Sequence, residues 1–128
     1  MVKIAIIESK FNRDKGVFKN TTLWKDLEER EKVEFSGVSL VDNEKIIIAS
    51  VKPFYLLTNL RIINHNYSIY YSDIKTVTIS EIDSKKAKIE KIELLKYNSQ
   101  VVFLEIEDGT WTTMYNIIKL LLNQSKRE

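Results

Sequence analysis

The sequence predicts a mainly β fold with a C-terminal α-helix and a short N-terminal helix. Three observations indicate it: residues 53–63 have the pattern of a hairpin that is apolar on both faces, short β-rich segments follow, and residues 111–123 trace one amphipathic helix. The chain has 128 residues, of which 44% are hydrophobic and 30% charged. This size and composition fit a single globular domain that needs no metal or cross-link to bury its core.

The first 20 residues allow two interpretations. Val2, Ile4 and Ile6 alternate as in a strand, yet Ile7 breaks the alternation and a short helix fits almost as well. No linker composition separates this segment from the rest of the chain. We therefore treat residues 1–30 as an N-terminal extension of the single domain 1–128.

A helix is predicted over residues 21–31. Leu23, Trp24 and Leu27 fall at helical spacing, and charge pairs four residues apart support the same interpretation. A helix this short must dock its apolar side on the rest of the domain to persist.

From Val33 onward the pattern is mostly β. Val33 and Phe35 alternate with polar residues as in a strand, residues 42–43 mark a turn, and residues 46–49 are an apolar run of strand length. These segments lead into the hairpin.

The hairpin occupies the centre of the predicted sheet. Asn59 suits its turn because a short amide side chain hydrogen-bonds locally and tolerates left-handed backbone angles. A two-residue loop beginning there places Leu57 opposite Ile62. Leu56 then lies opposite Ile63 on the other face. Since both faces are apolar, both need cover, which indicates a closed or sandwiched sheet.

Four further segments complete the β region. Three are predicted strands, at residues 68–71, 74–82 and 101–107. The fourth, residues 85–97, fits a helix by composition and a strand by pairing. We favour the strand because a three-residue loop at positions 98–100 gives an apolar register, with Leu94 opposite Leu104 and Ile92 opposite Ile106.

The last element is the helix at residues 111–123. Thr110 is a suitable N-cap residue, and a basic end suits the negative pole of the helix dipole. One face of the helix is apolar and carries Trp111, Met114, Ile118, Leu121 and Leu122.

Charge and composition exclude several classes of protein. Lys and Arg number 20 against 18 Asp and Glu, so the chain lacks the one-sided basic surplus of a nucleic-acid binder. It has no cysteine, which excludes a disulfide framework and thiolate chemistry. No apolar run reaches the roughly 18 residues of a membrane-spanning helix. We expect a soluble, cytoplasmic protein that binds no nucleic acid.

The segment YLLTNLRII at residues 55–63, the segment IYYSDI at residues 69–74 and the terminal helix carry a resemblance to a known family. Together they resemble pleckstrin-homology-like (PH-like) domains, more closely the bacterial PH and GRAM-like group, over about residues 33–123. The resemblance implies a partly open barrel of about seven antiparallel strands that is capped by helix 111–123. It also implies a non-catalytic module that binds lipid head groups, peptides or proteins, with bacterial members prone to self-association.

Three basic residues are the candidate ligand-binding residues. PH domains that grip phosphoinositides carry a Lys followed at a distance by Arg-x-Arg or Arg-x-Lys. Lys52 and Arg61 have suitable spacing for this pattern, but Ile63 stands at its last position, so the phosphate clamp lacks a member. We retain Lys45, Lys52 and Arg61 as candidates for contact with an anion.

The other chemistry-bearing residues favour structural roles. His65 is the only histidine and lies in a predicted turn, and no acid, base and nucleophile converge, so no catalytic residue is predicted. One histidine without cysteine predicts no metal site, and isolated glycines predict no phosphate loop, so no cofactor is expected. Lys85, Lys86, Lys88 and Lys91 alternate with acids, as is typical of edge strands protected against aggregation.

The sequence therefore predicts a non-enzymatic binding or scaffolding module that mediates protein–protein contacts or self-association. The homo-oligomer hypothesis depends on the apolar N-terminal segment and the doubly apolar hairpin, since exposed apolar patches mark contacts. The alternative is a peripheral membrane adaptor that binds anionic lipid head groups through Lys52 and Arg61.

Overall fold

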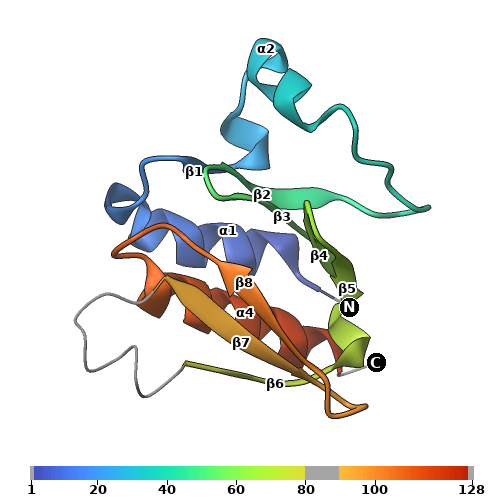
Figure 1. Ribbon diagram of the computed structural model, residues 1–128. Helices are drawn as coiled ribbons and strands as arrows, with labels where there is room; N and C mark the ends of the chain where they lie inside the picture. The colour runs from blue at the N-terminus through green and yellow to red at the C-terminus, as the bar shows by residue number, and fades with distance from the viewer. Residues whose placement is uncertain (1, 80–89, 127–128) are drawn as a thin grey trace.

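The structure, a computed structural model, describes residues 2–79 and 90–126 (Figure 1). Its two antiparallel sheets have the strand orders β1-β2-β3-β4-β5 and β6-β7-β8. The first sheet contains β1 (Thr21–Leu23), β2 (Ile46–Val51), β3 (Phe54–Thr58), β4 (Arg61–Asn64) and β5 (Ser68–Tyr70). The second contains β6 (Ile74–Thr78), β7 (Lys91–Lys96) and β8 (Val101–Glu105). The helices are α1 (Ile4–Arg13), α2 (Glu29–Lys32) and α4 (Trp111–Ser125).

This arrangement confirms the predicted fold class, a mainly β protein with a C-terminal helix and an N-terminal helix. Strands β2 to β8 account for the seven strands expected between residues 33 and 123, and β1 is an additional edge strand from the N-terminal extension. Helix α4 packs against β6 and β7, and α1 lies beside α4 and also contacts β2 (Figure 1).

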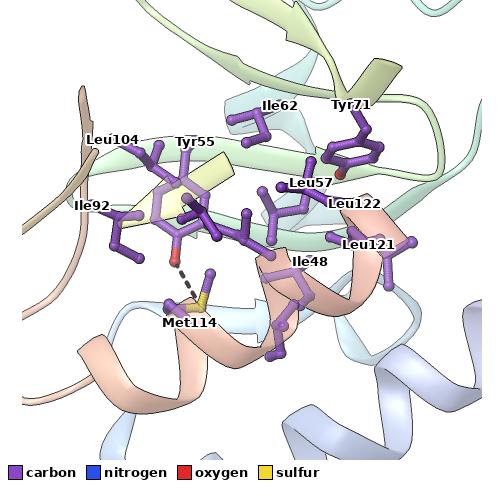
Figure 2. Packing of buried hydrophobic residues seen from close by; sticks show 14 of the residues in the cluster. Ile48, Tyr55, Leu57, Ile62, Tyr71, Ile92, Leu104, Met114, Leu121 and Leu122 are labelled. Carbon is purple, nitrogen blue, oxygen red and sulfur yellow. Dashed lines mark hydrogen bonds between the residues drawn. The ribbon is translucent and has the colours of Figure 1, made fainter. Parts of the chain in front are cut away.

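The main core lies between the two sheets and α4 (Figure 2). Tyr55 reaches from β3 across this core, and its hydroxyl donates a hydrogen bond to Sδ of Met114, 3.6 Å away. Burying each large apolar side chain stabilises the fold by about 1.5–3 kcal/mol. The fully buried residues that join the three layers include Leu57, Ile62, Ile92, Leu104, Met114, Ile118 and Leu121. As predicted, the apolar face of α4 closes the space between the sheets.

The predicted hairpin pairs in the expected register. Leu57 lies opposite Ile62, and Leu56 lies opposite Ile63. Leu57 and Ile62 face the main core, whereas Leu56 and Ile63 face a second, smaller cluster on the outer side of the sheet, where Phe35 covers them. Both faces of the hairpin are therefore covered, as their composition requires.

The residues before β2 cover both faces of the first sheet. Ile7 and Phe11 of α1 are buried in the main core, and the ring of Phe11 stacks on that of Phe18 with 4.6 Å between centroids. The chain then pairs with β2 through β1, and residues 24–38 cross to the outer face. The open alternative for residues 1–20 is thus resolved in favour of a helix.

Two predictions in this region are wrong. Residues 21–31 do not form one helix. Thr21 and Leu23 belong to β1 and point inward. The α-helix in this segment is the single turn α2, which begins at residue 29 after a capping box between Glu28 and Glu31. Residues 33–35 do not form a strand but a 3-10 turn that continues α2 and buries Phe35. Pairing with the β2 backbone outweighs the helical spacing, which local sequence alone cannot show.

The β7–β8 hairpin confirms a strand over residues 91–96, but its register differs from the predicted one by two residues. Leu94 pairs with Val102, because the loop consists of residues 97–99 and the N–H of Lys96 donates to the carbonyl of Gln100. Ser99 makes this loop possible by adopting a left-handed conformation with φ of 71°. A shift by two keeps every side chain on its predicted face.

Parts of two predicted strands lie outside the described residues. These are the end of the segment 74–82 and the beginning of the segment 85–97, together with Lys85, Lys86 and Lys88. Helix α4 begins at the predicted residue, but the hydroxyl of Thr110 donates to the carbonyl of Glu107 and makes no cap hydrogen bond with the helix.

Candidate binding surface

Arg61, the strongest of the anion candidates, forms an ion pair with Glu44. Its Nε donates to Oε2 of Glu44 at 2.9 Å and its Nη2 donates to Oε1 at 3.0 Å. Nη2 also donates to the carbonyl of Ser39. The side chains of Arg61 and Glu44 are only 13% and 0% exposed. The guanidinium is therefore already occupied by a carboxylate within the chain.

The electrostatics of this pair agree with its geometry. Burial by itself raises the pKa of Glu44, but hydrogen bonds from Arg61, Thr58 and the N–H of Val41 outweigh burial and lower the pKa below its ordinary value of 4.5. The hydrogen bonds to Glu44 raise the pKa of Arg61 in turn. Both groups are charged at neutral pH, and each neutralises the other.

The Thr-Asn-x-Arg sequence of the hairpin turn has a structural role. The hydroxyl of Thr58 accepts hydrogen bonds from the N–H groups of Leu60 and Arg61 and donates to Glu44. The side-chain oxygen of Asn59 accepts from the N–H of Lys45, and its amide group donates to the carbonyl of Asn43. The residues that carry the PH-like resemblance therefore hold the β3–β4 turn against the loop before β2.

The structure does not bring the three basic candidates together. Lys45 lies at the β3–β4 turn near Arg61, and its side chain is exposed. Lys52 is exposed in the β2–β3 turn, at the other end of β3. The five residues of β3 span about 17 Å, so Lys52 and Arg61 lie at opposite ends of the hairpin.

Two surface cavities flank a pair of stacked rings on the first sheet. The rings are those of Phe54 and His65, with centroids 4.2 Å apart and planes inclined by 17°. The larger cavity, of about 630 Å³, lies between residues 34–39 and the strands β4 and β5. The smaller cavity, of about 450 Å³, lies between the turn of residues 64–67 and β8. We call Phe54, His65 and the two cavities the aromatic surface.

Tyr67 joins the two sheets at the smaller cavity. Its hydroxyl donates to the carbonyl of Phe103 in β8 at 2.6 Å, and burial raises the pKa of Tyr67 to about 12. The ring of Phe103 is 47% exposed, and the ammonium of Lys91 lies 5.7 Å from its centroid. The side-chain oxygen of Asn64 accepts from the N–H of Tyr67 and fixes the turn.

The aromatic surface offers aromatic rings, side-chain amides and charged groups of both signs. Among residues 2–79 and 90–126, no three His, Cys, Asp or Glu side chains come together as metal ligands. The sequence predicts a turn at His65 but not the stacking of its ring on Phe54. The hairpin register could have revealed this stacking. Pairing of Tyr55 with Asn64 places the next residues of the two strands, Phe54 and His65, side by side.

A five-stranded and a three-stranded antiparallel sheet closed by a C-terminal helix define the PH-like class of fold. The chain is similar to the crystal structure of a DUF1696 family protein with a pleckstrin-homology domain from Shewanella loihica PV-4. The two have 16% sequence identity and a TM-score of 0.50, and the alignment covers 83% of this chain and 97% of the other. No protein-family model matches the sequence, and no curated protein matches it. The fold is therefore PH-like.

Within the described residues, no helix has both the length and the apolar character needed to cross a membrane.

Proposed function

We propose that this protein is a non-catalytic binding module that recognises a segment of a protein partner at the aromatic surface. The observation that carries the proposal is the meeting of two cavities at one stacked ring pair, Phe54 and His65. Aromatic side chains supply large contact area at low cost in side-chain entropy, and they are enriched where proteins bind one another.

The charges of the surface favour a protein segment over an anionic lipid head group. Arg61 is neutralised by Glu44, and Lys91 lies opposite Glu105 in the β7–β8 register. A phosphate ligand needs unpaired cations that converge on one point. A polypeptide can instead accept from the side-chain NH₂ group of Asn64 and use the side-chain amide of Asn66 as both donor and acceptor. The side-chain oxygen of Asn64 is already occupied by the N–H groups of Asn66 and Tyr67.

Selection from a random peptide library on the immobilised full-length chain tests the proposal. Selected peptides should bind His65→Ala at least about tenfold more weakly, whereas the control Asn123→Ala, an exposed residue of α4, should bind them normally. Failure to select any peptide, or equal binding to His65→Ala and wild type, contradicts the proposal. Salt-sensitive binding to anionic vesicles that weakens in Lys52→Ala would favour the membrane-adaptor alternative instead.

Self-association is the second form of protein contact that we propose for this chain. The exposed apolar residues Val101 and Phe103 lie along β8, an edge strand of the second sheet, and such edges pair readily with other strands. Light scattering coupled to size exclusion should show a mass above 15.0 kDa that falls when Phe103 is changed to Lys. A monomer at millimolar concentration excludes this form of contact.

A further inference from the structure

Residues 27–38, which we call the strap, cover the outer face of the first sheet with a single buried side chain. Phe35 is 5% exposed, whereas Val33 in the same turn is 66% exposed. The Phe35 ring meets the edge of Trp24 at 5.7 Å between centroids and lies 5.4 Å from the ring of Phe54. Leu27 and Val38, at the two ends of the strap, are half-buried and pack against the same cluster. The strap is therefore held on the sheet by one buried aromatic ring and two partly buried side chains.

The strap makes no hydrogen bond to the sheet within the described part of the chain. Its hydrogen bonds remain inside residues 27–38 or reach Trp24, which directly precedes it. Both flanks are fixed: β1 pairs with β2, and the carbonyl of Ser39 accepts from Arg61. The strap thus bridges two fixed points and can separate from the sheet without breaking any strand pairing.

The apolar face under the strap extends beyond it on two sides. The cavity of about 630 Å³ lies on the β4–β5 side and reaches Ile63, and another of about 430 Å³ lies on the β1–β2 side and reaches Ala49. Figure 1 shows α2 projecting away from the two sheets. One buried ring and two partly buried side chains offset the backbone entropy of a twelve-residue segment only in part, so we expect the strap to open at a lower free-energy cost than global unfolding.

We propose that the outer sheet face formed by Ala49, Phe54, Leu56 and Ile63 is a docking surface that the strap occupies in the absence of a partner. The partner is a protein segment that presents an aromatic side chain on a tight helical turn, because Phe35 on its 3-10 turn shows what the surface accepts. This inference depends on the proposed function for the nature of the partner. Opening of the strap is measured without any partner, so the two can fail separately.

Thiol labelling measures the opening, since the chain has no cysteine of its own. Ala49 and Ser50 are adjacent and buried, at 2% and 0% exposure, but Ala49 faces the strap and Ser50 pairs with the core residue Tyr55. Ala49→Cys should react with a thiol reagent at least about tenfold faster than Ser50→Cys in native buffer. Adding Phe35→Ala should accelerate only the reaction at position 49.

Equal labelling at both positions, rising together with denaturant, means that the face opens only on global unfolding, and overturns the proposal. Leu56→Cys is a second reporter beneath the strap if Ala49→Cys alters packing. Each rate is compared with the global unfolding rate of the same variant, so that lost stability is not mistaken for opening of the strap.

A synthetic peptide of residues 24–38 tests the partner chemistry. It should bind the full-length Phe35→Ala chain and bind wild type at least about tenfold more weakly, because the tethered strap competes at millimolar effective concentration. The same peptide with Ala at position 35 should bind neither chain. If position 49 of the Phe35→Ala chain labels rapidly but the peptide does not bind this chain, the surface does not recognise an aromatic side chain on a helical turn, and that part of the proposal is overturned. If the wild-type chain forms a dimer and Phe35→Ala abolishes that dimer, the surface is occupied by a second copy of the chain. This result overturns the proposal that a separate protein partner binds there.

Discussion

At the residue scale, the ion pair between Arg61 and Glu44 decides what this end of the hairpin can do. Breaking a buried pair on one side leaves an uncompensated charge, which costs about 3–5 kcal/mol. Arg61→Ala should therefore lower the free energy of unfolding by about 3 kcal/mol. We expect the lower end of this range because the arginine side chain is 13% exposed. Urea denaturation measures this change. The exposed neighbour Lys45→Ala should change it by less than about 0.5 kcal/mol. A similar small effect in Arg61→Ala would mean that the pair contributes little.

The same pair predicts a pH dependence. The pKa of Glu44 is lower in the folded state than its ordinary value of 4.5, so its ionised carboxylate stabilises the fold above that pH. This contribution is lost as the pH falls from 4.5 through the lower folded pKa. The difference in unfolding free energy between wild type and Glu44→Gln should be constant near neutral pH and shrink below about pH 4.5. A difference that persists unchanged to about pH 3 contradicts the lowered pKa.

At the element scale, α1 is predicted to be an integral part of the core. Phe11 is 3% exposed and Ile6 of the same helix is 45% exposed. Truncating a buried phenylalanine costs about 3–5 kcal/mol, so Phe11→Ala should destabilise the protein by that amount and Ile6→Ala by less than about 1 kcal/mol. Thermal denaturation monitored by circular dichroism distinguishes the two. Equally small effects would show that α1 is a loose extension.

The β7–β8 loop offers a stabilising substitution. Ser99 has a φ of 71°, which costs a residue with a Cβ about 1 kcal/mol relative to glycine. Ser99→Gly should therefore raise the free energy of unfolding by about 0.5–1 kcal/mol in urea denaturation. Asn43, with a φ of 65°, is the matched control, because asparagine tolerates this conformation and Asn43→Gly should be nearly neutral. Destabilisation in Ser99→Gly would mean that the serine side chain contributes more than the backbone strain costs.

Elements with a long local pattern could be predicted from the sequence, and elements fixed by distant partners could not. The central hairpin and α4 repeat their pattern over enough residues to be unambiguous. Strand β1 has only three residues, so its alternation between Thr21 and Leu23 is hidden by the helical spacing of Trp24 and Leu27. Helix α1 did carry a signal: Ile4, Ile7 and Phe11 are three and four residues apart, but the alternation of Val2, Ile4 and Ile6 obscured it.

At the scale of the whole molecule, the candidate binding surface arises from segments that meet only after folding. The aromatic surface needs β3, the turn after β4 and the edge of β8, and the strap comes from the segment between β1 and β2. No local pattern reports how such segments meet, so His65 was predicted only as a turn residue. The surroundings of Arg61 were hidden for a related reason. The partner of Arg61 is Glu44, 17 residues earlier, and the sequence does not show that they pair.

Glu107 connects the segment before β1 to the residues that precede α4. Its buried carboxylate accepts hydrogen bonds from the N–H groups of Lys19 and Asn20, each at 2.9 Å, and from the hydroxyl of Thr21. It thereby ties the start of β1 to the residues before α4, about 87 positions away. These three donors satisfy the buried carboxylate.

Glu107→Gln replaces one acceptor oxygen with an amide group that faces a donor and cannot accept its hydrogen bond. Leaving a buried donor unsatisfied costs about 1–3 kcal/mol, so the free energy of unfolding should fall by about 2 kcal/mol. Glu105→Gln, at an exposed position of β8, is the matched control and should be nearly neutral. Because the lost bonds join the N-terminal extension to the residues between β8 and α4, hydrogen exchange at Lys19 and Asn20 should accelerate more than exchange in β7. Uniform acceleration throughout the chain would instead show that Glu107 supports global stability without holding the extension in place.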